Sequence, residues 1–220
     1  MSAAGWHRGA RGVIAAASLA LCIAGLGSVT QGVAVPVRAG LAQDGLAREF
    51  TRRLESHRTT LATQQAARGQ AIRRIRPVGA PAATALALPA SGPIARITVA
   101  RLGVEEIVLA GAATHEQLAR GPAVLKQGDA ASPVTVLAAH RDTHFLFVRD
   151  LLEGDEITLQ YVTGTEERYR VVRFETVRWD TFSYPRDPAR PLLALATCYP
   201  FGGAEYGGPW RRVAWAERIT

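Results

Sequence analysis

Two residues able to do covalent chemistry each stand at the end of a predicted strand. Cys198 follows the apolar run LLALAT and precedes YPF, and His140 follows the run PVTVLAA. Pro200 stops strand pairing, so the thiol is expected where a strand opens into a loop, a common location for functional groups. A free thiol needs an acid/base partner and a nearby positive charge to be an effective nucleophile, and histidine transfers protons near neutral pH. The pattern suggests nucleophilic catalysis by Cys198 with His140.

The cysteine count adds to this hypothesis. The chain has two cysteines, Cys22 in an apolar segment near the N-terminus and Cys198 far along the chain. If the apolar segment stays in a membrane, the two cannot pair within one chain, and Cys198 is a lone thiol in an oxidising compartment. Such a leftover cysteine is a candidate reactive residue. The alternative is a small buried apolar side chain, because free cysteines are among the most buried residue types.

A positive charge comes from the segment WRRVAWAER near the C-terminus. Alternate residues of a strand share a face, so Arg211 and Arg212 point to opposite sides and only one can face a site shared with Cys198. A guanidinium stays charged and donates several hydrogen bonds, which suits it to hold a developing oxyanion. The alternation alone leaves open which arginine does so, and either could lie on the surface.

A second histidine raises the alternative of a metal site. His144 follows His140 in the segment HRDTH. A tightly bound zinc ion takes three or four protein ligands, and no further His, Cys or clustered carboxylates stand nearby in the sequence. We therefore expect no metal and no cofactor, and we expect His140 alone to have the acid/base role.

The N-terminus predicts a membrane anchor. Gly12–Val35 is a run of 24 residues without a charge, and a bilayer core needs about 20 such residues. His7, Arg8 and Arg11 precede the run, which places the N-terminus in the cytoplasm and everything after the run outside. The predicted location is the cytoplasmic (inner) membrane, single-pass, with the folded domain on the periplasmic or extracytoplasmic side. A cleaved signal peptide is the alternative, since small residues near Ala34 allow cleavage.

The net charge of +7 invites a nucleic-acid interpretation, but the charge is unevenly distributed. Residues 36–80 contain nine arginines against three acidic residues, whereas residues 81–220 contain fifteen basic against sixteen acidic residues. A near-neutral domain cannot supply a phosphate-binding field, so we expect no nucleic-acid partner. The basic segment could instead meet lipid headgroups.

Residues 41–76 are predicted to be helical. Leu46, Phe50, Leu54 and Leu61 fall roughly on one stripe among polar residues. This helix could pack on the folded domain, pair with a second copy, or serve as a solvated spacer. Residues 77–93 are uncharged and rich in Pro and Ala, and they are typical of a linker.

From residue 94 onward the sequence predicts short strands. Brief helices are expected over 114–120, where Thr114 and Gln117 match a capping box, and over 143–152. So many strands with so little helix favour a closed or nearly closed β-barrel, although the alternation would also allow a sandwich. The seven predicted strands are 94–99, 106–110, 133–139, 156–162, 168–177, 192–197 and 211–219.

Three motifs in this order resemble the sortase family. LATC, ending at Cys198, is similar to the family's TLxTC signature, with Ala194 where Thr is usual. AAHRDTHF, containing His140, is similar to its histidine motif, with Ala139 replacing Gly. Arg211 lies 13 residues after the cysteine on a terminal strand, as the family's arginine does, and 114–123 resembles the family's helix-and-loop segment. YPF and GGPWRR are most similar to the sortases of Gram-negative proteobacteria.

The resemblance implies a closed eight-stranded sortase-type β-barrel over 93–220, preceded by a cytoplasmic N-terminus (1–11), the anchor (12–35) and a juxtamembrane helix with its linker (36–92). It implies that Cys198 attacks an LPxTG-like sorting signal near the C-terminus of an exported protein and forms a thioester. His140 would protonate the leaving amine, Arg211 would stabilise the oxyanion, and an amine acceptor would resolve the acyl-enzyme. Substrate contacts are expected near Ala139, Thr197 and Tyr199.

Two other classes remain open. An exported cysteine peptidase or an L,D-transpeptidase-like enzyme would also use Cys and His, although the Gly-Cys-x-Arg motif of the latter is absent around Cys198. A membrane-tethered binding domain with a buried cysteine is the non-catalytic alternative.

Overall fold

The computed structural model describes residues 37–67, 90–202 and 207–219. The chain divides into two units, 1–40 and 41–220, and the second contains the folded domain. The predicted anchor (12–35) and most of the predicted linker lie outside the described residues, as does Cys22. Within the described ranges, no helix is both long enough and apolar enough to cross a membrane.

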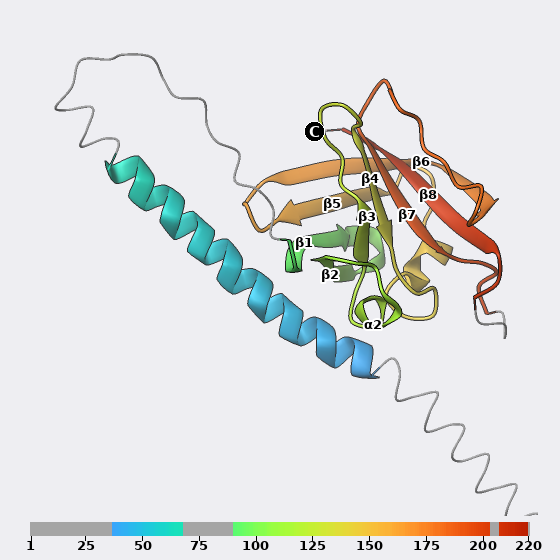
Figure 1. The fold of residues 1–220 in the computed structure, drawn as a ribbon, viewed down its shortest axis with the longest axis horizontal. Coiled ribbons are helices and arrows are strands. Elements are labelled where there is room, and N and C mark those ends of the chain that lie inside the picture. Colours follow the sequence, from blue (N-terminus) through green and yellow to red (C-terminus); the bar gives the residue numbers. More distant parts are fainter. Residues whose placement is uncertain (1–36, 68–89, 203–206, 220) are drawn as a thin grey trace, which may run out of the picture. The chain divides into compact units, whose positions relative to one another are not determined.

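Residues 92–218 form a closed barrel with the strand order β1-β2-β3-β4-β7-β8-β6-β5 (Figure 1). The prediction of a mainly β, closed eight-stranded barrel is confirmed, and the sandwich alternative is wrong. The strands are β1 Gly92–Val99, β2 Val104–Ala110, β3 Ala123–Lys126, β4 Val134–Ala138, β5 Glu156–Tyr161, β6 Glu166–Arg178, β7 Leu192–Cys198 and β8 Trp210–Arg218.

β3 is the strand that the sequence pattern missed. It is four residues long, pairs in parallel with β2 through Leu109 and Ala123, and pairs antiparallel with β4. A strand this short has too few residues to show alternation. It joins the β1–β2 hairpin to β4 and so closes the barrel.

Alternate residues along the strands point to opposite faces of the sheet and form one apolar cluster on each face. The barrel interior is filled by side chains such as Leu137, Leu195 and Ala214. The opposite face of β4, β7 and β8 carries a second cluster, which we call the outer cluster. Its buried members are Val134, Val136, Ala194, Ala196, Val213 and Trp215.

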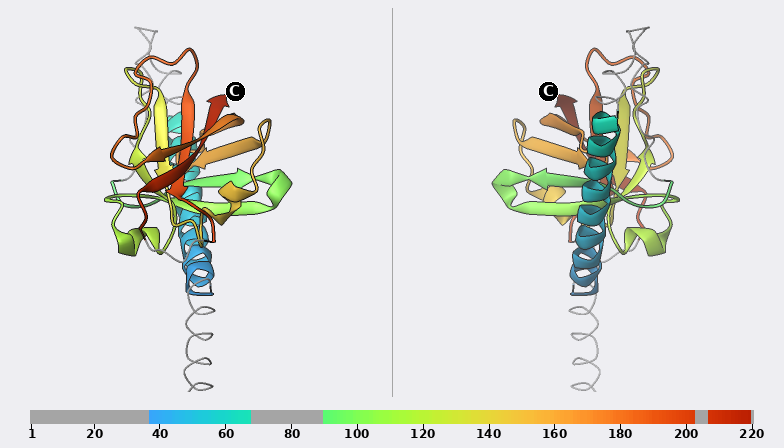
Figure 2. Two further views of the ribbon diagram at one scale, coloured as in Figure 1. Left: turned by 90° about the vertical axis from the view of Figure 1, so that its right-hand side faces the viewer. Right: turned by 90° about the vertical axis from the view of Figure 1, so that its left-hand side faces the viewer.

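A long helix spans residues 37–67, and its part from residue 41 onward lies along one side of the barrel (Figure 2). Three of the four residues of the predicted stripe form its buried face, with Phe50 fully buried and Leu46 and Leu54 nearly so. The prediction is wrong for Leu61, which is only half-buried and lies outside this contact. The three buried side chains pack on Ile107, Leu109 and Val162 of the barrel. The partner of the stripe is therefore this chain's own domain.

The long helix also makes polar contacts with the barrel. The Gln43 side chain accepts a hydrogen bond from the backbone N–H of Ile107 (2.6 Å) and donates one to the carbonyl of Arg120 (2.8 Å). The Arg53 guanidinium donates to the carbonyl of Ser91 at 3.1 Å. These bonds fix the helix in one register against β2 and the segment before β3.

The short helix α2, His115–Leu118, begins where the sequence predicted. The Thr114 side chain caps it by accepting a hydrogen bond from the N–H of Gln117 (3.2 Å). The reciprocal half of the predicted capping box is not made, because the Gln117 side chain instead donates to the carbonyl of Ala110 at 2.9 Å. That bond ties α2 to the end of β2.

The prediction of a helix over 143–152 is only partly right. The segment contains turns and a 3-10 helix, η2, at Leu146–Arg149, and a second 3-10 helix, η1, at Ala100–Leu102 connects β1 and β2. Hydrogen bonds run from Val148 to Phe145 and from Asp150 to Phe147, the three-residue spacing of a 3-10 helix. Burial of Phe147 and Val148 in the barrel core stabilises this tighter winding.

Candidate active site

Cys198 and Arg211 lie directly opposite each other. In the antiparallel pair β7–β8, Cys198 is the register partner of Arg211, and Thr197 is the partner of Arg212. Directly opposed residues of an antiparallel pair project from the same face of the sheet. Arg211 therefore shares the face of the thiol, and Arg212 does not.

His140 lies at the same level on the other side of Cys198. β4 runs parallel to β7, with Val134 beside Leu192 and Ala138 beside Ala196. The N–H of Ala139 still donates to the carbonyl of Ala196, at 3.4 Å, so the two chains remain together past the end of β4. Continued by two residues, this register sets His140 beside Cys198. His140, Cys198 and Arg211 thus form one row across three neighbouring chain segments.

The row continues the face that carries the outer cluster. Cys198 follows Ala194 and Ala196 by the two-residue period, and Arg211 precedes Val213 and Trp215. Phe182, from the segment between β6 and β7, stacks on Trp215 with ring centroids 6.0 Å apart and an interplanar angle of 23°. The row therefore lies at one end of a buried apolar cluster against which this connecting segment packs.

The two adjacent arginines have different surroundings. Nη1 of Arg211 donates to the carbonyls of Gly208 (2.6 Å) and Trp210 (2.8 Å), which places its guanidinium over the start of β8. The Arg212 guanidinium lies 4.7 Å from the centroid of the Phe174 ring. Phe174 packs against the barrel interior, so Arg212 belongs to the interior side of the sheet.

Cys198 is a free, half-buried cysteine, and the loop after it is tied to the histidine segment. Arg141, next to His140, is buried, and its Nη1 donates to the carbonyl of Pro200 at 2.6 Å. The N–H of Tyr199 donates to the carbonyl of Trp210, which extends the β7–β8 ladder by one bond. Sequence reasoning missed Arg141, although it lies inside the histidine motif.

The three predicted substrate contacts differ in exposure. Thr197 is buried, and its hydroxyl donates to the carbonyl of Ala139 at 2.8 Å. Ala139 is also buried, whereas Tyr199 is 37% exposed and packs edge-on against Phe201. The Thr197 side chain thus links β7 to the segment that carries His140. A role of these residues in substrate binding remains a prediction.

His140 is partly withdrawn from solvent. Burial lowers the pKa of its imidazole, and the neighbouring charge of His115 lowers the pKa further. The two rings meet in an edge arrangement with centroids 4.7 Å apart and an interplanar angle of 66°. His115 comes from α2, and no sequence pattern singled it out.

His144 lies apart from this row and has a structural setting. Its ring is buried, with Nδ1 2.8 Å from a carboxylate oxygen of Glu106 and Nε2 3.3 Å from the carbonyl of Ala119. It therefore links the turn after β4 to β2 and to the end of α2. Among the described residues, no group of three or more His, Cys, Asp or Glu side chains is arranged to hold a metal ion.

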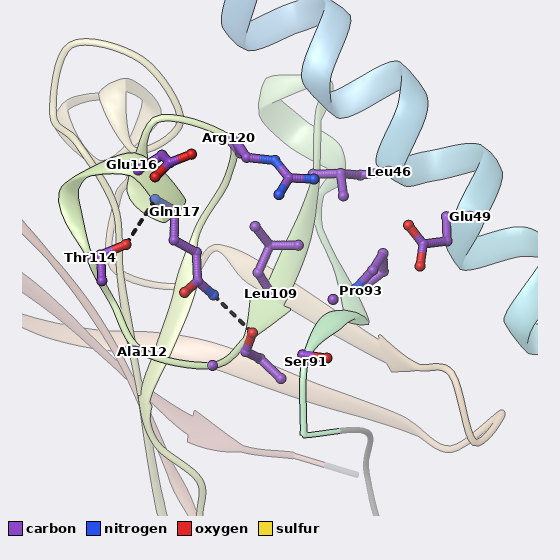
Figure 3. A pocket seen from close by; sticks show the side chains of 13 residues that line it. Leu46, Glu49, Ser91, Pro93, Leu109, Ala112, Thr114, Glu116, Gln117 and Arg120 are labelled. Atoms are coloured by element: carbon purple, nitrogen blue, oxygen red, sulfur yellow. Dashed lines mark hydrogen bonds between the residues drawn. The ribbon is translucent and has the colours of Figure 1, made fainter.

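A pocket of about 380 Å³ lies between the long helix and α2 (Figure 3). Leu46, Leu109 and Pro93 supply apolar walls, and Arg120 and Glu116 supply charge. The pocket includes none of the three residues in the catalytic row. Its hydrogen bonds, from Gln117 to Thr114 and Ala110, hold α2 in place.

Comparison with known proteins gives a family match for the barrel. Residues 97–219 match the family model described as "Sortase domain". The chain is 35% identical over 88 residues to Sortase D of Bacillus subtilis (strain 168). That alignment covers 39% of this chain and 42% of the relative, so the similarity spans less than half of the relative's length.

Solved structures show the same fold. Pilus-related Sortase C of Group B Streptococcus superimposes with a TM-score of 0.56 at 21% identity, covering 79% of this chain and 96% of that one. Sortase A from Corynebacterium diphtheriae gives a TM-score of 0.51 at 19% identity, covering 59% of this chain and 62% of that one. At these identities the similarity establishes the architecture of the barrel.

Proposed function

Because the chain belongs to the sortase family, we propose that it is a cysteine transpeptidase that uses Cys198 as nucleophile, His140 as acid/base and Arg211 as oxyanion stabiliser. The observation that carries the proposal is the register of β7 against both of its neighbours. Cys198 on β7 is paired with Arg211 on β8, and continuing the parallel register of β4 and β7 brings His140 to the same level. This register supports a nucleophile, a proton carrier and a permanent cation on one face.

In the first half-reaction the Cys198 thiolate attacks the carbonyl carbon of a peptide bond. The carbonyl oxygen becomes an oxyanion, which the Arg211 guanidinium stabilises by hydrogen bonding and charge. The intermediate collapses as His140 donates a proton to the leaving amine, and a thioester remains on Cys198. In the second half-reaction an incoming amine gives a proton to His140 and displaces the thiolate, which forms a new amide.

The surroundings of His140 determine which protonation state predominates. Because burial and the charge of His115 lower its pKa, the imidazole is mostly neutral at pH 7. The reactive pair of thiolate and imidazolium is then a minor form in equilibrium with the neutral pair. A less basic imidazole holds its proton more weakly, which favours its transfer to the leaving amine.

We further propose that the acyl donor is an exported protein with an LPxTG-like C-terminal sorting signal. Tyr199 is exposed beside the thiol and offers such a peptide an aromatic contact. The outer cluster is buried and ends at Cys198, so it would support the site from below and not contact the peptide. The buried Thr197 and Ala139 would likewise contribute by shaping the end of β7. The YPF and GGPWRR segments favour the proteobacterial group of the family.

The proposed location is the inner membrane, with the barrel on the periplasmic side. It rests on the uncharged run 12–35 and the basic residues before it. We expect the full chain to sediment with membranes and to be degraded by a protease added from the periplasmic side. A soluble mature protein beginning near Val35 would instead show that the run is a cleaved signal.

The reaction class is tested by adding an amine. The full chain is incubated with an LPxTG-type peptide, with and without a glycine-terminated amine, and the products are identified by mass spectrometry. We expect the amide product only when the amine is present, and only slow hydrolysis without it. Release of free acid at the same rate in both mixtures would identify a peptidase instead.

The histidine assignment is tested by paired variants. His140→Ala is expected to slow acylation by about 10²–10⁴-fold, the usual contribution of a general acid–base group. His144→Ala is expected to reduce the rate far less and to lower thermal stability, because His144 links the turn after β4 to Glu106 and Ala119. Equal rate losses in the two variants would contradict the assignment.

A further inference from the structure

The ring of His115 is in direct contact with the ring of His140. Their centroids are 4.7 Å apart in an edge arrangement. His115 is the first residue of α2 and is exposed to solvent, whereas His140 is half-buried. A second imidazole therefore lies directly against the proposed acid/base.

α2 holds His115 in this place through contacts at both of its ends. The Thr114 cap and the bond from Gln117 to the carbonyl of Ala110 fasten its first turn to β2 (Figure 3). Beyond its last turn, Nε2 of His144 contacts the carbonyl of Ala119, and Gln43 of the long helix donates to the carbonyl of Arg120. The position of His115 is therefore set by the barrel and by the long helix together.

One ring nitrogen of His140 has no partner. Nε2 is buried without a hydrogen-bond partner among the described residues. An unpartnered ring nitrogen in this place can exchange a proton with Cys198 or with the leaving amine.

We propose that His115 is a positioning residue for His140, whose ring packs edge-on against the imidazole and whose charge opposes protonation of His140. The proposal rests on the proposed function and deepens it, because His140 must be protonated to donate a proton during acylation and the charge of His115 opposes that protonation. The other charged or titratable groups around His140 are Asp142 and His144 on its own turn. Cys198 and Arg211 approach from β7 and β8.

The sign of the effect follows from these groups. Burial is the largest influence lowering the pKa of His140, and the charge of His115 is next. The carbonyl of His115 and the carboxylate of Asp142 act in the opposite direction and raise it. Replacing the His115 side chain removes the repulsion and keeps the carbonyl, so the variant should bind a proton at His140 at higher pH than the wild-type protein does.

The test is a titration of His140 by NMR in the full chain with labelled histidine. His115→Asn and His115→Gln are compared with the wild type, and His57→Asn on the long helix is the matched control that removes an imidazole elsewhere. We expect His140 to titrate at higher pH in both His115 variants and at the wild-type position in His57→Asn. An unchanged His140 titration in both His115 variants would overturn the proposal.

A second readout is the pH dependence of single-turnover acylation of Cys198. The acidic limb of the profile, where the rate depends on protonation of His140, should move to higher pH in His115→Asn and stay in place in His57→Asn. A purely structural effect would lower the rate at every pH without moving the limb. The NMR titration needs no substrate, so it decides the role of His115 even if no acyl-enzyme forms and the proposed function fails.

Discussion

Exchanging the two neighbouring arginines for alanine separates catalysis from stability. Arg211 shares the face of Cys198, so Arg211→Ala should remove one oxyanion donor and slow acylation by about 10²–10³-fold, or about 2.7–4 kcal/mol of transition-state stabilisation. Arg212 lies over the Phe174 ring on the interior side, so Arg212→Ala should lose a cation–π contact worth about 0.5–2 kcal/mol of folding free energy. Arg211→Lys should restore little, because an ammonium lacks the planar fork of the guanidinium.

The assay measures both quantities on the same three proteins. Single-turnover acylation of Cys198 by a sorting peptide is followed by intact mass, and urea unfolding is followed by circular dichroism. We expect the rate to fall mainly in Arg211→Ala and the unfolding midpoint to fall mainly in Arg212→Ala. If Arg212→Ala proves the variant with the large rate loss, the assignment of the two faces of β8 is wrong.

Three further outcomes concern stability. Phe50→Ala should lower the free energy of unfolding by about 3–5 kcal/mol, because Phe50 is fully buried between the long helix and the barrel. The control is Thr63→Ala, at an exposed position of the same helix. If Phe50→Ala lowers the free energy of urea unfolding no more than Thr63→Ala does, the helix is not docked on the barrel. Asp155 has a lowered pKa because Arg101 donates hydrogen bonds to its carboxylate. The ionised carboxylate therefore stabilises the folded state fully above a pH of about 3.9, the ordinary pKa of the unfolded chain, and this contribution is lost as the pH falls through the lower pKa of the folded state. Asp155→Asn should therefore unfold at lower urea than the wild type at pH 7, with the difference shrinking at low pH, and a constant difference would refute the ion pair. The lowered pKa of His140 means that the folded state takes up a proton at lower pH than the unfolded state does. The free energy of unfolding should therefore fall as the pH drops below about 6.5, and it should fall less steeply in His140→Asn than in the wild type. The same pH dependence in the wild type and in His140→Asn would argue against the lowered pKa.

The sequence predicted what depends on local periodicity. Alternation in β8 correctly separated Arg211 from Arg212, and the apolar stripe of Leu46, Phe50 and Leu54 correctly identified the buried face of the long helix. Both patterns are written in consecutive residues, so they need no knowledge of the neighbouring strand. The stripe could not reveal its partner, because Ile107 and Val162 are far away in sequence.

What the sequence did not predict depends on contacts between distant segments. β3 is too short to show a pattern, and its place in the barrel follows from pairing with β2 and β4. The contact of His115 with His140 requires α2 to be fastened to the barrel at both ends. Reasoning from the residues suggested His140 and Cys198 because both follow strands, but their common level comes from the parallel pairing of β4 with β7. Similarly, Arg141 gave no signal that it would hold the loop at Pro200.

The central claim is that Cys198 forms a thioester with a peptide acyl group. Its most direct test is intact-mass analysis of the full chain after rapid mixing with an LPxTG-type peptide and acid quenching, followed by fragmentation to locate the adduct. The result expected is a mass increase equal to the acyl fragment, located on Cys198, removed by hydroxylamine and absent from Cys198→Ala. Peptide cleavage at an undiminished rate in Cys198→Ala, or an adduct on another residue, would contradict the claim.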